Sequence, residues 1–95
     1  MSQTYAYLYK VIVSNRETKE DEIAFEIPVK AENKQQALEF VTSDSITALL
    51  KEVLKDYTKE KYKDEIKIEV FVVRGKEEAE KPTYEVFTSL KKIKQ

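Results

Sequence analysis

The sequence predicts an α+β fold, in which a four-stranded antiparallel sheet built in the order ββ-α(α)-ββ carries the helical segment 33–62 on one face. Four stretches with strand chemistry occur as two pairs, and the one stretch with helical periodicity lies between the pairs. The 95 residues are enough for one modest core and too few for two. We therefore expect a single domain, residues 1–95.

The first pair of strands is predicted over Tyr5–Val13 and Glu22–Ala31, joined by the polar segment 14–21. The first strand is rich in aromatic and β-branched residues and is apolar on both faces, which favours a central position. Pro28 has no amide hydrogen, so the second strand is expected at a sheet edge. Strict alternation places these apolar residues of the second strand on one face: Ile23, Phe25, Ile27, Val29 and Ala31.

The helical segment begins with Asn33, an N-cap residue, and has Gln36 in the capping-box position. A second cluster of capping residues, Thr42–Ser45, indicates either a kink or a break into two helices. We favour two helices, Asn33 to about Val41 and Asp44 to about Tyr62. The apolar stripe of the second helix has helical spacing and comprises Ile46, Leu49, Leu50, Val53, Leu54 and Tyr57.

The second pair of strands is predicted over Glu65–Val73 and Thr83–Leu90. The segment between them, 74–82, is charged and contains Gly75, the one glycine of the sequence. The basic tail, residues 91–95, is expected to fray. The order of the four strands in the sheet is left open by these patterns.

Composition excludes several classes of function. The net charge is −1, from 17 basic and 18 acidic residues, so the chain as a whole has no long-range attraction for nucleic acid. Without His or Cys, the chain has no thiol nucleophile, no His acid or base and no Cys-based zinc site. One glycine cannot build a Gly-rich phosphate loop, and the calcium-loop spacing is absent. We expect no enzymatic activity, no cofactor and no metal site.

The chain also lacks the patterns of secretion and membrane insertion. The first residues show neither a basic segment nor an apolar one, as a signal peptide would. No apolar run approaches the roughly 20 residues of a membrane span. We expect a cytoplasmic protein that does not associate with membranes.

Three tyrosines, Tyr5, Tyr7 and Tyr9, share one face of the first strand. They could form a stacking platform for single-stranded nucleic acid, or they could be core residues that point toward the helices. Val11 continues the same face without a charge, whereas the opposite face carries Lys10, and this pattern favours the core.

The face of the sheet that the helices leave uncovered is predicted to be apolar. A single helical layer covers one face only, and contiguous exposed apolar area is typical of protein interfaces. The candidate partner-binding residues come from three strands, with the tyrosines added for the case in which they point outward: Leu8, Ile12, Phe71, Val73, Phe87, Tyr5, Tyr7 and Tyr9.

These observations predict a small non-enzymatic protein-binding module, whose partner is a second copy of the chain or another protein. The alternative is a single-stranded nucleic-acid-binding module, which would use the strand of Tyr5, Tyr7 and Tyr9 together with the basic C-terminal tail. The tail carries three lysines: Lys91, Lys92 and Lys94.

One passage carries a resemblance to known proteins. The strand end Ile27–Ala31 followed by Glu32–Val41 fits the pattern V-x-A-x-x-x-x-x-A. It resembles the strand-to-helix passage of small phage and mobile-element accessory proteins, including small anti-CRISPR proteins with a hairpin, a helix and a second hairpin. The resemblance implies stoichiometric binding, with inhibition of a host defence complex as its sharpest form. It transfers no site residue to this chain.

Overall fold

The computed structural model describes residues 5–41, 43–74, 77–78 and 80–94, with only the backbone of residue 78. Thr42 of the predicted capping cluster and Gly75 of the predicted loop therefore lie outside the described residues. The elements, in chain order, are β1 (Tyr5–Ser14), β2 (Asp21–Ala31), α1 (Lys34–Val41), α2 (Asp44–Val53), β3 (Glu65–Arg74), β4 (Glu77–Glu78), β5 (Tyr84–Ser89) and α3 (Leu90–Ile93).

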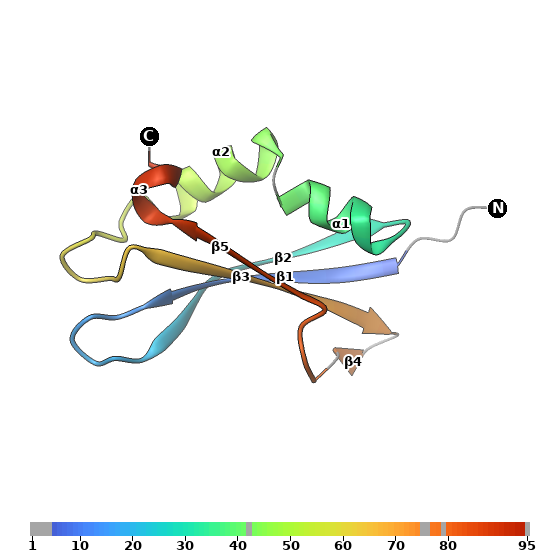
Figure 1. Cartoon of the computed structure of the whole chain (residues 1–95), viewed down its shortest axis with the longest axis horizontal. Coiled ribbons are helices and arrows are strands. Elements are labelled where there is room, and N and C mark those ends of the chain that lie inside the picture. Colours follow the sequence, from blue (N-terminus) through green and yellow to red (C-terminus); the bar gives the residue numbers. More distant parts are fainter. Residues whose placement is uncertain (1–4, 42, 75–76, 79, 95) are drawn as a thin grey trace.

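The strands form one antiparallel sheet in the order β2-β1-β3-β4, in which β5 also pairs with β3. Because β1 occupies one edge of β3, β5 and β4 share the other edge, β5 along residues 65–70 and β4 along residues 73–74. The helices lie on one face of this sheet (Figure 1). The α+β prediction is confirmed, as are the central position of β1 and the edge position of the strand that contains Pro28.

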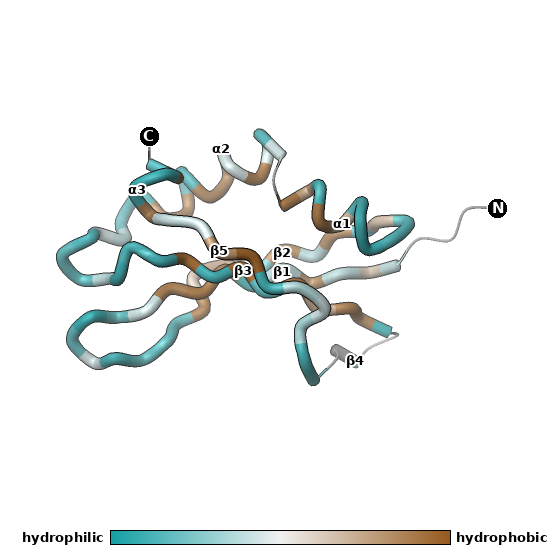
Figure 2. The backbone as a smooth tube through the Cα atoms, viewed as in Figure 1, coloured by the Kyte–Doolittle hydropathy of each residue, from teal (hydrophilic) through white to brown (hydrophobic). Residues whose placement is uncertain are grey.

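The core lies between β1 and the helices. In Figure 2 the tube is hydrophobic in parts of α1, α2 and the centre of the sheet, whereas the start of β1 is pale. The prediction that the tyrosines point toward the helices is confirmed for Tyr7 and Tyr9, which are buried. The Tyr9 ring packs edge-on against Phe40 with 5.5 Å between centroids, and its hydroxyl donates to the Ala37 carbonyl. Tyr9 thus joins α1 to the centre of the sheet.

The two predicted helices are separate. Asn33 opens α1 by accepting from the Gln36 amide at 2.8 Å, as an N-cap residue does. Ser43 has extended backbone angles and caps α2 by accepting from the Ile46 amide at 3.4 Å. The helical segment therefore breaks and restarts at the polar cluster, rather than kinking.

α2 ends at Val53, so the prediction that it continues to about Tyr62 is wrong. Side chains from elsewhere in the chain bind backbone carbonyls of the segment that follows α2. Arg16 donates from Nε to the carbonyls of Lys59 and Tyr62, at 2.7 and 3.0 Å. The Lys94 ammonium donates to a further carbonyl of the same loop at 2.6 Å. These hydrogen bonds supply partners for loop carbonyls, so the segment can leave the helical conformation without leaving them unpaired.

The expected fraying of the C-terminal tail is also wrong for the described residues. Leu90 and Ile93 are buried, and the chain between them forms the short helix α3. Ser89 caps this helix by accepting from the Lys92 amide at 3.0 Å. Burial of two large aliphatic side chains outweighs the entropy of a short tail.

A β-bulge interrupts the alternation of β2. Phe25 lies opposite Val11, but Ile23 lies opposite Ile12, so Ala24 is an extra residue with no partner of its own. Because side chains alternate between the two faces of a sheet, one extra residue moves every side chain beyond it to the opposite face. Ile23 therefore points away from the helices and is 53% exposed, which corrects the prediction that it shares the face of Phe25.

The same inversion brings Glu22 to the helix side of the sheet. Its carboxylate accepts a hydrogen bond from the Tyr62 hydroxyl at 3.1 Å. Burial, together with this hydrogen bond, raises the pKa of the Tyr62 phenol above its usual value. The bulge thus connects the end of β2 to the loop that follows α2.

We expect the protein to lose stability between pH 10 and about 12. Burial and the neighbouring Tyr7 raise the pKa of Tyr9 to about 12, whereas the phenol ionises near pH 10 in the unfolded chain. The stability that comes from keeping the Tyr9 phenol protonated in the folded chain is fully present below pH 10. It is lost as the pH rises toward the folded pKa, by about 1.4 kcal/mol per pH unit. Urea unfolding at pH 9, 10, 11 and 12 measures this fall in the free energy of unfolding.

The control is Tyr9→Phe. At neutral pH this variant should lose about 0.5–1.5 kcal/mol, because the Ala37 carbonyl loses its donor. Its alkaline slope should be shallower than that of the wild type. Equal slopes would show that Tyr9 ionises alike in the folded and unfolded chains.

Candidate functional site

The candidate site is the sheet face opposite the helices, here called the outer face. Its four strands are about 4.8 Å apart, and each has about nine residues with a rise of about 3.3 Å per residue. The projected area of the outer face is therefore roughly 600 Å². That is close to the roughly 800 Å² that each partner contributes to a standard protein interface. The outer face is therefore large enough to bind a protein.

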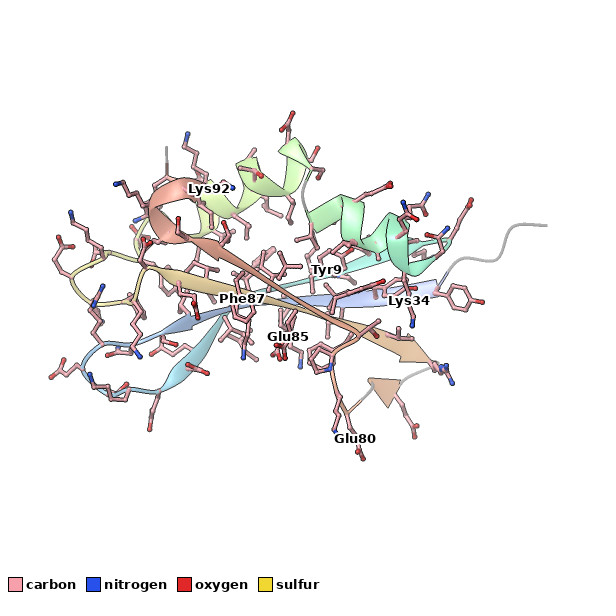
Figure 3. All side chains as sticks on the ribbon, viewed as in Figure 1. Tyr9, Lys34, Glu80, Glu85, Phe87 and Lys92 are labelled. Atoms are coloured by element: carbon pink, nitrogen blue, oxygen red, sulfur yellow. The ribbon has the colours of Figure 1, made fainter. Side chains whose placement is uncertain are left out.

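A row of charged residues crosses the middle of the outer face. Lys10 lies opposite Glu26 on one side and Glu69 on the other, and Glu69 lies opposite Glu85. Figure 3 shows Glu85 on the helix-free side of the sheet. This charged row contains one residue from each of β2, β1, β3 and β5, so the sheet register alone brings its members together.

The charged row divides the apolar residues of the outer face into two groups, so the predicted contiguous patch is wrong. The group toward the β4 end of the sheet contains Leu8, Phe71 and Val73. The group toward the opposite end contains Ile12, Ile23 and Phe87.

The first group offers little to a partner. Phe71 is only 7% exposed, and the Lys10 ammonium lies 4.7 Å from its ring centroid in a cation–π contact. Leu8 and Val73 are half-buried beside it. Phe71 therefore offers little surface, and its contact with a partner stays a prediction.

The second group, here called the Phe87 group, is open to solvent. Phe87 is 55% exposed and Ile23 is 53% exposed, and both belong to the same cross-strand row. Half-buried Ile12 and Lys67 stand between them. Ile12, Lys67 and Phe87 help to line a shallow hollow of about 150 Å³. Large hydrophobic side chains at the rim of a hollow, close to carboxylates, are typical of a binding surface.

The three tyrosines of β1 lie on the opposite side of the sheet from the Phe87 group. Tyr7 and Tyr9 are buried on the helix side, so they cannot contact a partner or stack on bases. Tyr5 is 49% exposed, but it shares the helix side with them and lies at the far end of β1. The arrangement does not form the aromatic platform that nucleic-acid binding would need.

The basic tail is folded back rather than extended. Lys91 and Lys94 line a hollow of about 580 Å³ together with Arg16 and Lys59. Arg16 and Lys94 already donate to backbone carbonyls, as described above. The Asp64 carboxylate accepts from the Lys91 amide at 3.0 Å and adds negative charge to this hollow.

The described residues form neither a metal site nor a membrane-spanning helix. No three of their carboxylates come together as a group that could hold a metal ion. None of the helices in the described part of the chain has the length and apolar character that crossing a bilayer requires.

Comparison with known proteins finds no matching family model, no matching curated protein and no matching solved structure. The geometry of the outer face is therefore the basis for a functional proposal.

Ile23 and the charged row were missed by sequence reasoning. Strict alternation assigns Ile23 to the core, and no residue in Glu22–Phe25 indicates a bulge. The charged row depends on the register between strands that are distant in sequence, so no local pattern reveals it.

Ile23→Ala should change the free energy of unfolding by less than about 0.5 kcal/mol, because the side chain is exposed. The matched substitution Ile66→Ala, at a fully buried position of β3, should cost about 2–5 kcal/mol. Urea unfolding of the two variants measures both. Similar losses in the two variants would contradict the bulge.

Proposed function

We propose that this protein is a non-enzymatic binding module, which docks the Phe87 group and the neighbouring charged row on another protein. The observation that carries this proposal is the exposure of Phe87 and Ile23 on a sheet face without helices. The absence of His and Cys from the sequence supports a role in binding rather than catalysis.

Phe87 is the expected anchor of the contact. A few large side chains supply most of the binding energy of an interface, and aromatic residues are prominent among them. Ile12 and Ile23 extend the apolar area on the same row, and the hollow beside Phe87 accepts a side chain of the partner. Carboxylates on either side of this row form the polar rim.

The charges of the outer face favour a basic partner over a second copy of the chain. Its described side chains include five carboxylates against three ammonium groups, a net charge of −2. Two such faces would repel each other, whereas a surface with lysine or arginine beside apolar side chains would complement it. The carboxylates are those of Asp21, Glu26, Glu65, Glu69 and Glu85, and the ammonium groups are those of Lys10, Lys30 and Lys67.

The finer form of this proposal is stoichiometric inhibition of a host defence complex, as in small phage accessory proteins. The resemblance of the passage from Ile27 to Val41 supports it. Defence nucleases bind nucleic acid through basic surfaces. An acidic face with an aromatic anchor has the charge to occupy such a surface.

The wild-type chain should be a monomer by light scattering and should co-purify at a stoichiometric ratio with one protein from its source cells. Phe87→Glu should reduce this association at least tenfold, because the substitution removes the anchor and adds a repulsive charge. Co-purification followed by titration of the isolated pair measures it.

The matched control is Ser45→Glu, which adds the same charge at an exposed position of α2, where the helix dipole tolerates it. It should bind as the wild type does. A homodimer that Phe87→Glu dissociates would refute the choice of a basic partner. Equal binding by Phe87→Glu and the wild type, or no stoichiometric partner at all, would refute the proposed interface.

A further inference from the structure

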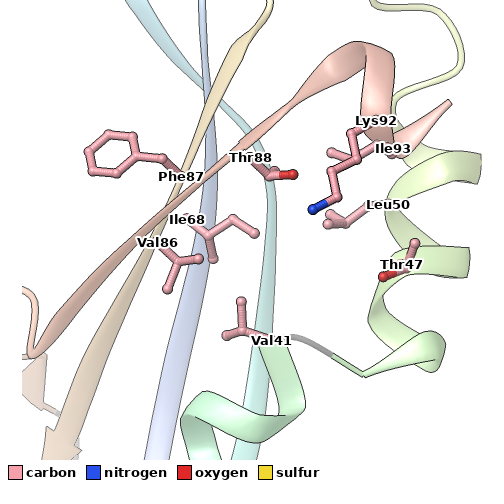
Figure 4. A pocket seen from close by; sticks show the side chains of 9 residues that line it. All are labelled: Val41, Thr47, Leu50, Ile68, Val86, Phe87, Thr88, Lys92 and Ile93. Atoms are coloured by element: carbon pink, nitrogen blue, oxygen red, sulfur yellow. The ribbon is translucent and has the colours of Figure 1, made fainter. Parts of the chain in front are cut away.

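A pocket of about 250 Å³ lies on the helix side of the sheet, between the helices and β5 (Figure 4). Phe87 belongs to its lining as well as to the Phe87 group. Val86 and Thr88 of β5 face the pocket, whereas the ring of Phe87, between them in sequence, points away from it. A ligand in this pocket would therefore leave the outer face free.

The walls of the pocket are apolar and come from distant parts of the chain. Val41 ends α1, Leu50 belongs to α2, Ile68 to β3 and Ile93 to α3, and all four are buried. Val86 completes this wall from β5. These side chains offer a ligand aliphatic surface on several sides, as small-molecule pockets do.

The polar side chains of the pocket are half-buried Thr88 and the exposed residues Lys92 and Thr47. Figure 4 shows the Lys92 ammonium extending between Thr88 and Leu50. This ammonium makes no hydrogen bond or ion pair with the described residues, and the Thr88 hydroxyl makes none either. Among the nine residues that line the pocket, only Lys92 carries a charge. Thr47 adds a second hydroxyl, which donates to the Ser43 carbonyl at 3.1 Å and can still accept.

We propose that this pocket binds a small carboxylic acid with an apolar tail. The Lys92 ammonium would pair with the carboxylate, and the Thr88 hydroxyl would donate a second hydrogen bond to it. The tail would lie against Leu50, Ile68 and Val86. A cavity of about 150 Å³ holds the six carbons of benzene, so about 250 Å³ accommodates roughly ten non-hydrogen atoms. That is the size of an eight-carbon fatty acid.

The pairing of one cation with apolar walls sets the ligand class. A phosphate or a polar anion would leave the walls without contacts, and an apolar ligand without charge would leave the ammonium and the hydroxyl unused. An acid with an aliphatic tail satisfies both parts of the pocket. Charge-assisted hydrogen bonds are the stronger kind, so the ammonium supplies most of the selectivity.

The test is a titration of the ¹⁵N-labelled chain with octanoate, followed by NMR. Saturable shifts are expected at the amides of Val86, Thr88 and Lys92. Octanol, which has the same tail without the charge, should bind at least about tenfold more weakly. Lys92→Gln should weaken octanoate binding by a similar factor, and Thr88→Val should weaken it less.

The matched control is Lys91→Gln, which removes the same charge from the adjacent residue, placed in the hollow with Arg16 rather than in this pocket. It should bind octanoate as the wild type does, and all variants should keep the wild-type spectrum elsewhere. Equal affinity for octanol and octanoate would overturn the proposal, as would undiminished binding by Lys92→Gln. Shifts that do not saturate, or that spread outside the pocket, would also overturn it.

Discussion

Burial of one side of β1 beneath the helices is the constraint on which the rest of the structure depends. β1 is paired along both edges and packs Tyr7, Tyr9, Val11 and Val13 against the helices. Because side chains alternate along a strand, the intervening residues must face the other way. One layer of helices cannot cover that second face. The outer face is therefore a consequence of how the core is built.

The β-bulge in β2 interrupts this simple alternation and places Ile23 on the outer face. Without the extra residue Ala24, Ile23 would join the core and Glu22 would face solvent on the outer side. With it, Ile23 joins Phe87 and half-buried Ile12 in one cross-strand row, and Glu22 accepts from Tyr62 on the helix side. A single unpaired residue thus serves both the proposed interface and the anchoring of a distant loop.

Contacts of the C-terminal segment determine how α3 and the loop after α2 are held together. Lys94 binds the loop after α2, and burial of Leu90 and Ile93 holds α3 against the helical layer. Lys91 and Lys92 of this short helix lie at different sites: Lys91 lines the hollow with Arg16, and exposed Lys92 lines the apolar pocket. The proposed acid-binding site therefore requires the last turn of the chain to be folded.

The sequence by itself predicted β1, β2, β3, β5, α1, the start of α2 and the layers, but neither β4 nor α3. Period-two alternation, helical spacing and the capping residues Asn33 and Ser43 are local features, and they predicted that these elements exist and where the two longer helices begin. Tertiary structure alone decided the end of α2, the bulge at Ala24 and the charged row of the outer face. Each of these depends on hydrogen bonds or register between residues far apart in the chain, such as Arg16 with Lys59, or Glu69 with Glu85. These pairings exist only in the folded chain, where they can override local conformational preferences. No local sequence pattern therefore predicts them.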